Sequence, residues 1–251
     1  MIPVIPAVVR ALADAHPVRE VWVNEIGGRT YSVGDRYVKW TPPDAVGRGL
    51  DVAGEVARLE WAWAFTPVPR VLDHGSDDRG SWLVTAALPG ESAIADRWLA
   101  EPATAVAAIG SGLRAMHDAL PVAECPFTWS AAERIAAAVP DPSRWHADHA
   151  GLTAAEALRR IAEPPPVDRL VVCHGDACAP NTLLHDDGRW LAHVDLDCLG
   201  VADRWADIAV ATWSTEWNYG PSWTGALLDA YGVAPDPERT TYYRLLWDLG
   251  P

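Results

Sequence analysis

The sequence predicts an α+β protein made of two parts, a β-rich part over residues 1–88 and a mostly helical part over residues 89–251. The chain of 251 residues is near the size at which a single hydrophobic core stops growing. Runs rich in Val, Trp and Tyr, broken by glycines, fill the first part, whereas apolar residues at helical spacing fill the second. Leu88, Pro89 and Gly90 separate the two patterns and mark the predicted boundary.

The β-rich part is expected to hold antiparallel strands and one helix. Residues 19–40 form the first strand segment, because glycines interrupt an otherwise apolar run. Residues 51–65 have apolar side chains at helical spacing, and two prolines soon afterwards end the helix. Its core face is predicted to comprise Val52, Val56, Leu59 and Trp63. Residues 70–90 then give two strands joined by a polar turn.

Helices dominate the second part. Residues 103–119 and 131–139 are predicted to be helical, as are residues 203–213, before a terminal segment over 240–251. The buried face of the first of these helices is predicted to comprise Val106, Ile109, Leu113 and Met116.

Two local signals add detail to this part. Thr153 and Glu156 have the spacing of a capping box at a helix start, so Glu156 is interpreted as a capping residue. Residues 181–197 instead predict a hairpin of two short strands, with the turn at residues 186–188.

The charge of the chain restricts its partners. Asp and Glu number 34 and Lys and Arg 20, which gives a formal net charge of −14. Such a charge argues against nucleic acid or an anionic membrane and fits a cationic small molecule, although acidic proteins are also common for solubility alone.

Targeting signals are not expected. The N-terminal residues lack a basic start before an apolar stretch, and no run approaches the apolar length of a membrane helix. The 4 cysteines are too few for a disulfide framework in a chain of this size. The sequence therefore predicts a cytoplasmic protein.

Several ligand-type residues surround the segment VVCHGDACAPNTLL at residues 171–184. They are Cys173, His174, Cys178, His185, His193 and Cys198. A zinc site is disfavoured because no C-x-x-C pair is present and the predicted hairpin would scatter the histidines. A cysteine nucleophile is equally weak, since no partner histidine is singled out, and the cysteines are interpreted as packing residues.

Phosphoryl transfer uses more of these residues. Asp176 and Asn181 reproduce the H-x-D-x-x-x-x-N spacing of a kinase catalytic loop, and Asp195 follows one hairpin later. A loop carboxylate can accept a proton from a substrate hydroxyl, while an amide oxygen and a second carboxylate hold Mg²⁺ against nucleotide phosphates. Asp176 and Asn181 could be turn residues and Asp195 the end of a strand, but the ordered triple favours the chemistry. His174 is then interpreted as shaping the loop.

With these motifs in place, the sequence resembles the aminoglycoside phosphotransferase family, and most of all its 3′-type members. The resemblance rests on residues 54–61, 67–73, 171–184, 194–212 and 242–251. It implies a protein-kinase-like fold, in which a nucleotide-binding lobe with one helix is joined by a hinge to a larger catalytic and substrate-binding lobe. It also implies an antibiotic-inactivating kinase that uses ATP and Mg²⁺, with GTP not excluded.

The resemblance assigns roles to single residues. Asp176 corresponds to the catalytic base, and Asn181 and Asp195 to magnesium ligands. Lys39 corresponds to the lysine that contacts nucleotide phosphates, and Glu55 to its helix partner. Lys39 and Glu55 could instead be ordinary solvated surface residues, but the triple of Asp176, Asn181 and Asp195 favours the functional roles.

Other correspondences are less direct. Backbone groups of the hinge, from Ala86 to Leu88, are expected to bind adenine, and Asp207 is expected to support the catalytic loop. The chain departs from the family where Asp197 and Cys198 replace the usual Gly and Arg after Asp195. The segment GGRT is likewise a poor match to a glycine-rich phosphate loop, so this loop is assigned by position alone.

The acceptor is expected to be a cationic antibiotic. The resemblance places acidic contacts in a loop, where Asp148 is the candidate, and near the chain terminus at Asp248. Trp217 or Tyr219 could stack on a sugar, or could simply be core residues. We expect a monomer or a weak dimer.

Two alternatives stay open. One is a kinase of the same fold that acts on another antibiotic or a small metabolite. The other is a non-catalytic nucleotide-binding pseudo-kinase, which the irregular glycine segment would suit.

Overall fold

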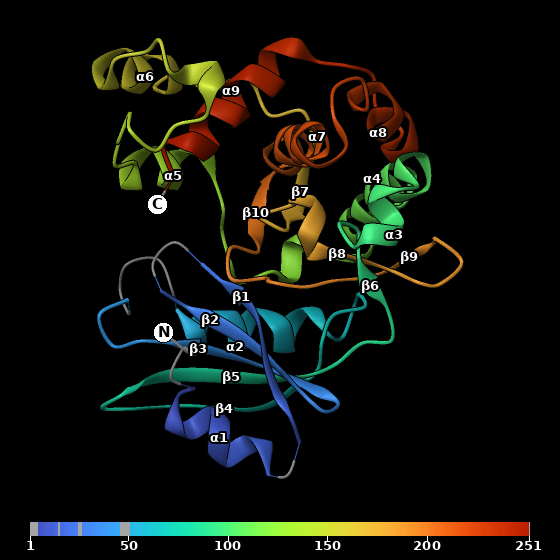
Figure 1. Cartoon of the computed structure of the whole chain (residues 1–251). Coiled ribbons are helices and arrows are strands. Elements are labelled where there is room, and N and C mark those ends of the chain that lie inside the picture. Colours follow the sequence, from blue (N-terminus) through green and yellow to red (C-terminus); the bar gives the residue numbers. More distant parts are fainter. Residues whose placement is uncertain (1–4, 15, 25–26, 46–50, 251) are drawn as a thin grey trace. The chain divides into compact units, whose positions relative to one another are not determined.

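The computed structural model describes residues 5–14, 16–24, 27–45 and 51–250. It divides into two compact units, a first that ends at Pro89 and a second that begins at Gly90. Figure 1 shows strands gathered in the first unit and helices in the second. None of the helices in these described ranges has both the length and the apolar character required to span a membrane.

An antiparallel five-stranded sheet forms the centre of the first unit, with strand order β1-β2-β3-β5-β4. The strands are β1 (Val18–Val23), β2 (Arg29–Val33), β3 (Arg36–Thr41), β4 (Val71–Asp77) and β5 (Gly80–Ala86). Three of them lie in the first predicted strand segment and two in the second, so the expected antiparallel start is confirmed.

Helices cover both faces of this sheet. They are α1 (Ala7–Ala13) and α2 (Val52–Ala62). Val9 of α1 packs in a core with Val38 of β3, while Lys39, the next residue of β3, pairs with Glu55 of α2. Because neighbouring residues of a strand point to opposite faces, the two helices lie on opposite sides of the sheet (Figure 1).

The unit differs from the sequence prediction in two details. One helix is predicted, whereas α1 is present as well; its 7 residues are too few for a periodic pattern to stand out. Trp63 follows the end of α2 and is 51% exposed, so its prediction as a core residue is wrong. The buried stripe of α2 instead passes through Val56, Leu59 and Ala62.

The second unit is mostly helical. Its helices are α3 (Asp96–Leu99), α4 (Pro102–Ala119), α5 (Ala131–Ala137), α6 (Ala154–Ile161), α7 (Trp205–Tyr219), α8 (Thr224–Tyr231) and α9 (Pro237–Asp248). Its strands are β6 (Glu91–Ser92), β7 (Leu170–Cys173), β8 (Thr182–Leu184), β9 (Trp190–His193) and β10 (Gly200–Asp203). They form an antiparallel pair, β10-β7, and a three-stranded sheet, β6-β8-β9.

Most of the predicted local structure of this unit is confirmed. All four predicted core residues of α4 are buried. Thr153 and Glu156 form the capping box of α6, and β8 and β9 form the predicted hairpin, with Gly188 at φ 82° in its turn. α7 extends beyond the predicted residues 203–213, and the short helices α3 and α8 are additions.

Candidate active site

The loop from His174 to Asn181 joins two strands of the second unit. β7, which precedes it, ends in Val171, Val172 and Cys173, all with 0% exposure. A 3-10 turn over Ala179–Asn181 closes the loop just before β8. Since a buried strand begins the loop and a buried turn ends it, its course is fixed at both ends.

Asp207, in the first turn of α7, holds the start of this loop. Its carboxylate is fully buried and accepts the backbone N–H of His174 at 2.6 Å and that of Gly175 at 2.9 Å. His117 Nε2 on α4 donates to the same carboxylate at 2.9 Å. Because an ionised carboxylate only accepts, the other ring nitrogen, Nδ1, accepts from the hydroxyl of Tyr231 at 2.8 Å. Asp207 therefore contacts the start of the loop, as expected from the sequence.

The charge of Asp207 is stabilised although it is buried. Burial by itself would raise its pKa, but the hydrogen bonds from His117 Nε2–H and from the Gly175 amide hold the pKa below its usual value. Several N–H groups directed at one carboxylate favour its ionised form. The support is therefore a charged group at neutral pH.

Gly175 has a positive φ of 87° and no room for a side chain. A Cβ at this position would lie 2.3 Å from the carbonyl oxygen of Cys198. Glycine is needed here both for the backbone conformation and for the close approach of the two segments.

Asp176 has one carboxylate oxygen engaged and one without a partner. The amide Nδ2 of Asn181 donates to Asp176 Oδ2 at 3.0 Å and to its backbone carbonyl at 2.9 Å. Asp176 Oδ1 is buried and has no hydrogen-bond partner in the described part of the chain. A buried carboxylate oxygen left unpaired is costly, which makes Asp176 a candidate functional residue.

Val194 links the third residue of the predicted triple to the loop. Its N–H donates to the carbonyl of Asn181 at 3.0 Å, and its carbonyl accepts from His174 Nε2 at 3.0 Å. Asp195 follows at φ 67°, an uncommon conformation for a residue other than glycine. Through Val194, the backbone next to Asp195 is hydrogen-bonded to that of Asn181. Asp197, where the sequence departs from the family pattern, follows two residues after Asp195.

His174 shapes the loop, as the sequence analysis predicts. Its Nδ1 accepts from the backbone N–H of Asp176 at 3.3 Å, and its Nε2 donates to the Val194 carbonyl. Both ring nitrogens are used in one consistent tautomer, so the ring is a bridge between the two segments and not a metal ligand.

The structure thus brings Asp176, Asn181 and the backbone next to Asp195 together, and residues 22–243 match the phosphotransferase enzyme family. The chain belongs to the phosphotransferase enzyme family. An aminoglycoside 3′-phosphotransferase of Streptomyces fradiae is 36% identical to it, over 92% of this chain and 93% of that protein. Streptomycin 3″-kinase of Streptomyces griseus is 34% identical, over 89% of this chain and 88% of its own length.

A solved structure extends the comparison to the fold of the phosphotransferase family. It is the aminoglycoside phosphotransferase APH(3″)-Id from Streptomyces rimosus in complex with ADP and streptomycin, 28% identical with a TM-score of 0.74. The match covers 96% of this chain and 95% of that one. The predicted fold class, α+β and protein-kinase-like, is confirmed.

The first unit of this phosphotransferase family member brings Lys39 and Glu55 together. Lys39 Nζ lies 2.6 Å from Glu55 Oε1, and the Glu55 side chain is 8% exposed against 29% for Lys39. The predicted pair therefore forms, with the carboxylate buried in α2 and the ammonium group reaching it from β3.

The predicted hinge amides differ in their use. Ala86 N donates to the Arg70 carbonyl at 2.9 Å, and Ala87 N donates to that of Asp35 at 2.9 Å. The amide of Leu88 donates to no group among the described residues. The segment GGRT covers residues 27–30 and leads into β2; the Gly28 amide donates to Asn24 Oδ1 at 2.7 Å and the Gly27 amide to the Asn24 carbonyl at 3.2 Å.

Asp148 and Asp248 lie near one another in the second unit but in different surroundings. Asp148, in the 3-10 turn Ala147–His149, has a side chain that is 52% exposed and accepts from Trp213 Nε1 at 3.0 Å. Asp248 is the last residue of α9, and its side chain is 4% exposed.

The two aromatic candidates, Trp217 and Tyr219, differ in exposure and in hydrogen bonding. Trp217 is 41% exposed, so its ring is available to a ligand. The hydroxyl of Tyr219 donates to the carbonyl of Ala93 at 2.6 Å, which makes it a structural residue.

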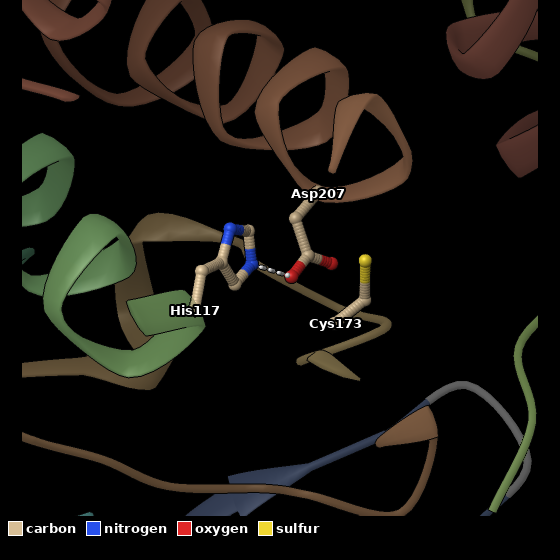
Figure 2. A group of neighbouring side chains, drawn as sticks. All are labelled: His117, Cys173 and Asp207. Atoms are coloured by element: carbon tan, nitrogen blue, oxygen red, sulfur yellow. Dashed lines mark hydrogen bonds and ion pairs between the residues drawn. The ribbon is translucent and has the colours of Figure 1, made fainter. Parts of the chain in front are cut away.

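One buried group resembles a metal site. Figure 2 shows His117, Cys173 and Asp207, whose ligand-type atoms all lie within 4.8 Å of one another. His117 and Asp207 are hydrogen-bonded to each other, the Cys173 thiol donates to the Asp203 carbonyl at 3.4 Å, and burial raises the pKa of that thiol well above its usual value. A protonated thiol and a carboxylate that already accepts three N–H groups do not suit a metal ion.

The sequence analysis does not identify His117 and Tyr231 as supports of the loop. A partial signal exists for His117, since a polar residue directly after Met116 falls next to the buried stripe of α4. No signal links Tyr231 to the site, because only the packing of α8 on α4 brings the two rings together.

Proposed function

We propose that the protein transfers the γ-phosphate of ATP to a hydroxyl group of an aminoglycoside, with the 3′-hydroxyl as the first candidate. The observation that carries the proposal is the state of Asp176, with Oδ2 held by Asn181 and Oδ1 buried and unpartnered. The similarity to an aminoglycoside 3′-phosphotransferase and to a structure that holds ADP and streptomycin supports this substrate class.

Asp176 acts as the base of the reaction. Its Oδ1 accepts the hydrogen of the acceptor hydroxyl and orients that oxygen toward the γ-phosphorus. As the new P–O bond forms and the bond to ADP breaks, the hydroxyl proton passes to Asp176. Asn181 keeps the carboxylate in one orientation, because its Nδ2 binds both the side chain and the backbone of Asp176.

Asn181 and Asp195 would hold Mg²⁺. The Nδ2 of Asn181 faces Asp176, which leaves the amide oxygen for a cation, and Asp195 supplies a carboxylate close by along the backbone. Oxygen ligands of this kind suit a hard cation such as Mg²⁺, which neutralises phosphate charge when bound.

The first unit would bind the rest of the nucleotide. Lys39, paired with Glu55, would contact phosphate oxygens, and the amide of Leu88 would bind adenine; the Lys39–Glu55 contact at 2.6 Å supports the first role. We extend the proposal to a cationic acceptor bound near Asp148 and Asp248 and to action in the cytoplasm, where ATP is abundant. The net charge of −14 would attract such an acceptor.

Replacement of the base tests the proposal. Asp176→Asn should lower kcat by roughly 10²- to 10⁴-fold, the range for a positioned general base. Turnover is measured as ADP formed in the presence of acceptor. Asp186→Asn, the same change at a side chain that is 98% exposed, serves as the control and should leave kcat unchanged. An Asp176→Asn variant with full turnover would remove the base assignment.

An acceptor panel tests the substrate class. It comprises an aminoglycoside with a free 3′-hydroxyl, its 3′-deoxy analogue, streptomycin and a macrolide, with the product mapped by NMR. ADP formed with the first and not with the second places the phosphate on the 3′-oxygen. Turnover only with streptomycin or the macrolide indicates another acceptor class. Stabilisation by ATP and Mg²⁺ with no product from any acceptor indicates the non-catalytic module.

A further inference from the structure

A buried carboxylate at the end of α9 holds the 3-10 turn that carries Asp148. Asp248 Oδ2 accepts the backbone N–H of His146 at 2.9 Å and the Nδ1–H of His149 at 2.6 Å. The side chains of Asp248 and His149 are 4% and 9% exposed. A carboxylate enclosed in this way cannot reach a dissolved ligand without releasing the turn that it holds.

The surroundings of the turn reinforce its position. The His149 ring packs against Trp213, with centroids 5.4 Å apart, and Trp213 Nε1 donates to Asp148 Oδ2. Trp213, which is fully buried, thereby connects the anchored side of the turn to its exposed carboxylate.

The exposed side of the turn continues into Trp217. The indole N–H of Trp217 donates to His146 Nε2 at 3.1 Å, and His146 Nδ1 lies 3.5 Å from Asp148 Oδ1. The His146 ring therefore lies next to both Trp217 and Asp148, and both of these side chains are accessible. A carboxylate next to an aromatic face is suited to an ammonium group.

We infer that Asp248 and His149 are positioning residues for the turn that carries Asp148, whose contact with a cationic group of the acceptor is part of the function proposed above. Asp248 thus acts on acceptor binding only through the turn at residues 147–149. This inference rests on the proposed function, since it concerns the acceptor of the same site, and it assigns different tasks to two carboxylates that the sequence treats as equivalent.

A double-mutant cycle tests the division of tasks. Asp148→Asn should raise the KM for a cationic aminoglycoside by roughly 10- to 100-fold, in line with the loss of a charged hydrogen bond, with little change in kcat. The Tm and the near-UV circular dichroism of the tryptophans should not change. Asp248→Ala should also raise KM, but with a Tm lower by several degrees and an altered near-UV spectrum.

The double variant decides between positioning and contact. In the Asp148→Asn background, Asp248→Ala should raise KM no further, because the turn then positions nothing. Multiplied KM effects in the double variant would overturn the inference, since they indicate two separate contacts with the acceptor.

Conservative changes provide the matched control. Asp248→Asn keeps an oxygen that accepts from His146 N and His149, so it should restore Tm and KM toward the values of the unchanged protein. If Asp248 contacts the acceptor directly, Asp248→Asn should impair KM as much as Asp248→Ala does. Should Asp248→Ala fail to fold, His149→Phe takes its place, because it keeps the ring packed on Trp213 and removes the N–H donor.

The two levels of the proposal fail in different ways. An unchanged protein that turns over no aminoglycoside refutes the proposed function, whereas turnover with multiplicative KM effects refutes only the positioning role. The thermal and spectroscopic contrast between Asp248→Ala and Asp148→Asn needs no activity. Equal Tm values and equal spectra for these two variants would show that Asp248 does not hold the turn.

Discussion

Two loops of the second unit are held in the same way by buried carboxylates. At the loop that carries Asp176, Asp207 accepts hydrogen bonds from two backbone N–H groups and from His117. At the turn that carries Asp148, Asp248 accepts hydrogen bonds from one backbone N–H group and from His149. In both cases an aspartate on a helix fixes the loop, and a second aspartate lies on the loop that is fixed.

The two anchors differ in their position along their helices. Asp207 lies in the first turn of α7, where the helix dipole favours a negative charge, and it accepts with both oxygens. Asp248 ends α9, where the dipole opposes a negative charge. We therefore expect the loop that carries Asp176 to be held more firmly than the turn that carries Asp148. A base needs one fixed geometry, while a turn that recognises an acceptor can tolerate adjustment.

Loss of the stronger anchor should have the largest effect. Asp207→Ala should lower the free energy of unfolding by about 3 to 5 kcal/mol, because two backbone N–H groups and a buried histidine lose their acceptor. Turnover should be lost as well, since His174 and Gly175 fix the start of the loop. Urea unfolding and the ADP assay measure both effects. Asp229→Ala on α8, an exposed aspartate, is the control. A loss no larger than that of Asp248→Ala would show that Asp207 is not the stronger anchor.

The sequence indicates the loop that carries Asp176 more directly than the turn that carries Asp148. Asp176, Asn181 and Asp195 are recognisable because a short spacing and one hairpin join them, and such local relations are visible in a sequence. The hairpin and the face of α4 are likewise local patterns, which is why both were predicted. The role of Asp207 was indicated only through the resemblance to a family.

What the sequence could not show depends on contacts between distant segments. Asp248 meets His149 across 99 positions, and His117 meets Tyr231 across 114. No periodicity encodes such pairs, so Asp148 and Asp248 looked like equal candidates for an acceptor contact. Trp63 was misplaced for a related reason, because a periodic pattern does not reveal where a helix ends.

The charge of the stronger anchor should make its contribution depend on pH. The pKa of Asp207 is below its usual value in the folded protein, so its ionised form adds stability above the unfolded pKa of about 3.9, and this stability is lost as the pH falls through the folded pKa. The difference in unfolding free energy between the unchanged protein and Asp207→Asn should be constant from about pH 5 to 7. Below about pH 4 it should shrink, by at most about 1.4 kcal/mol per pH unit.

Urea unfolding between pH 3 and 7 measures this difference, with Asp229→Asn as the control for a surface carboxylate. A difference that does not change down to pH 3 would mean that Asp207 supports the loop by hydrogen bonding alone. The comparison of the anchors would then rest on geometry and not on charge.

The smallest expected effect lies at the outer end of the stronger anchor. Tyr231→Phe removes the hydroxyl that donates to His117 and should lower the free energy of unfolding by about 0.5 to 1.5 kcal/mol. Tyr242→Phe is a matched control, because its hydroxyl donates to the Ile161 carbonyl at 3.0 Å, between α9 and α6. Both variants should lose similar stability, but only Tyr231→Phe should lower kcat, and by less than about tenfold, since a tenfold change already corresponds to about 1.4 kcal/mol. Equal kcat values for the two variants would show that Tyr231 does not help to support the loop that carries Asp176. A lower kcat for Tyr231→Phe alone would show that the supporting contacts extend from His117 to α8. The turn held by Asp248 has no corresponding contact among those described above.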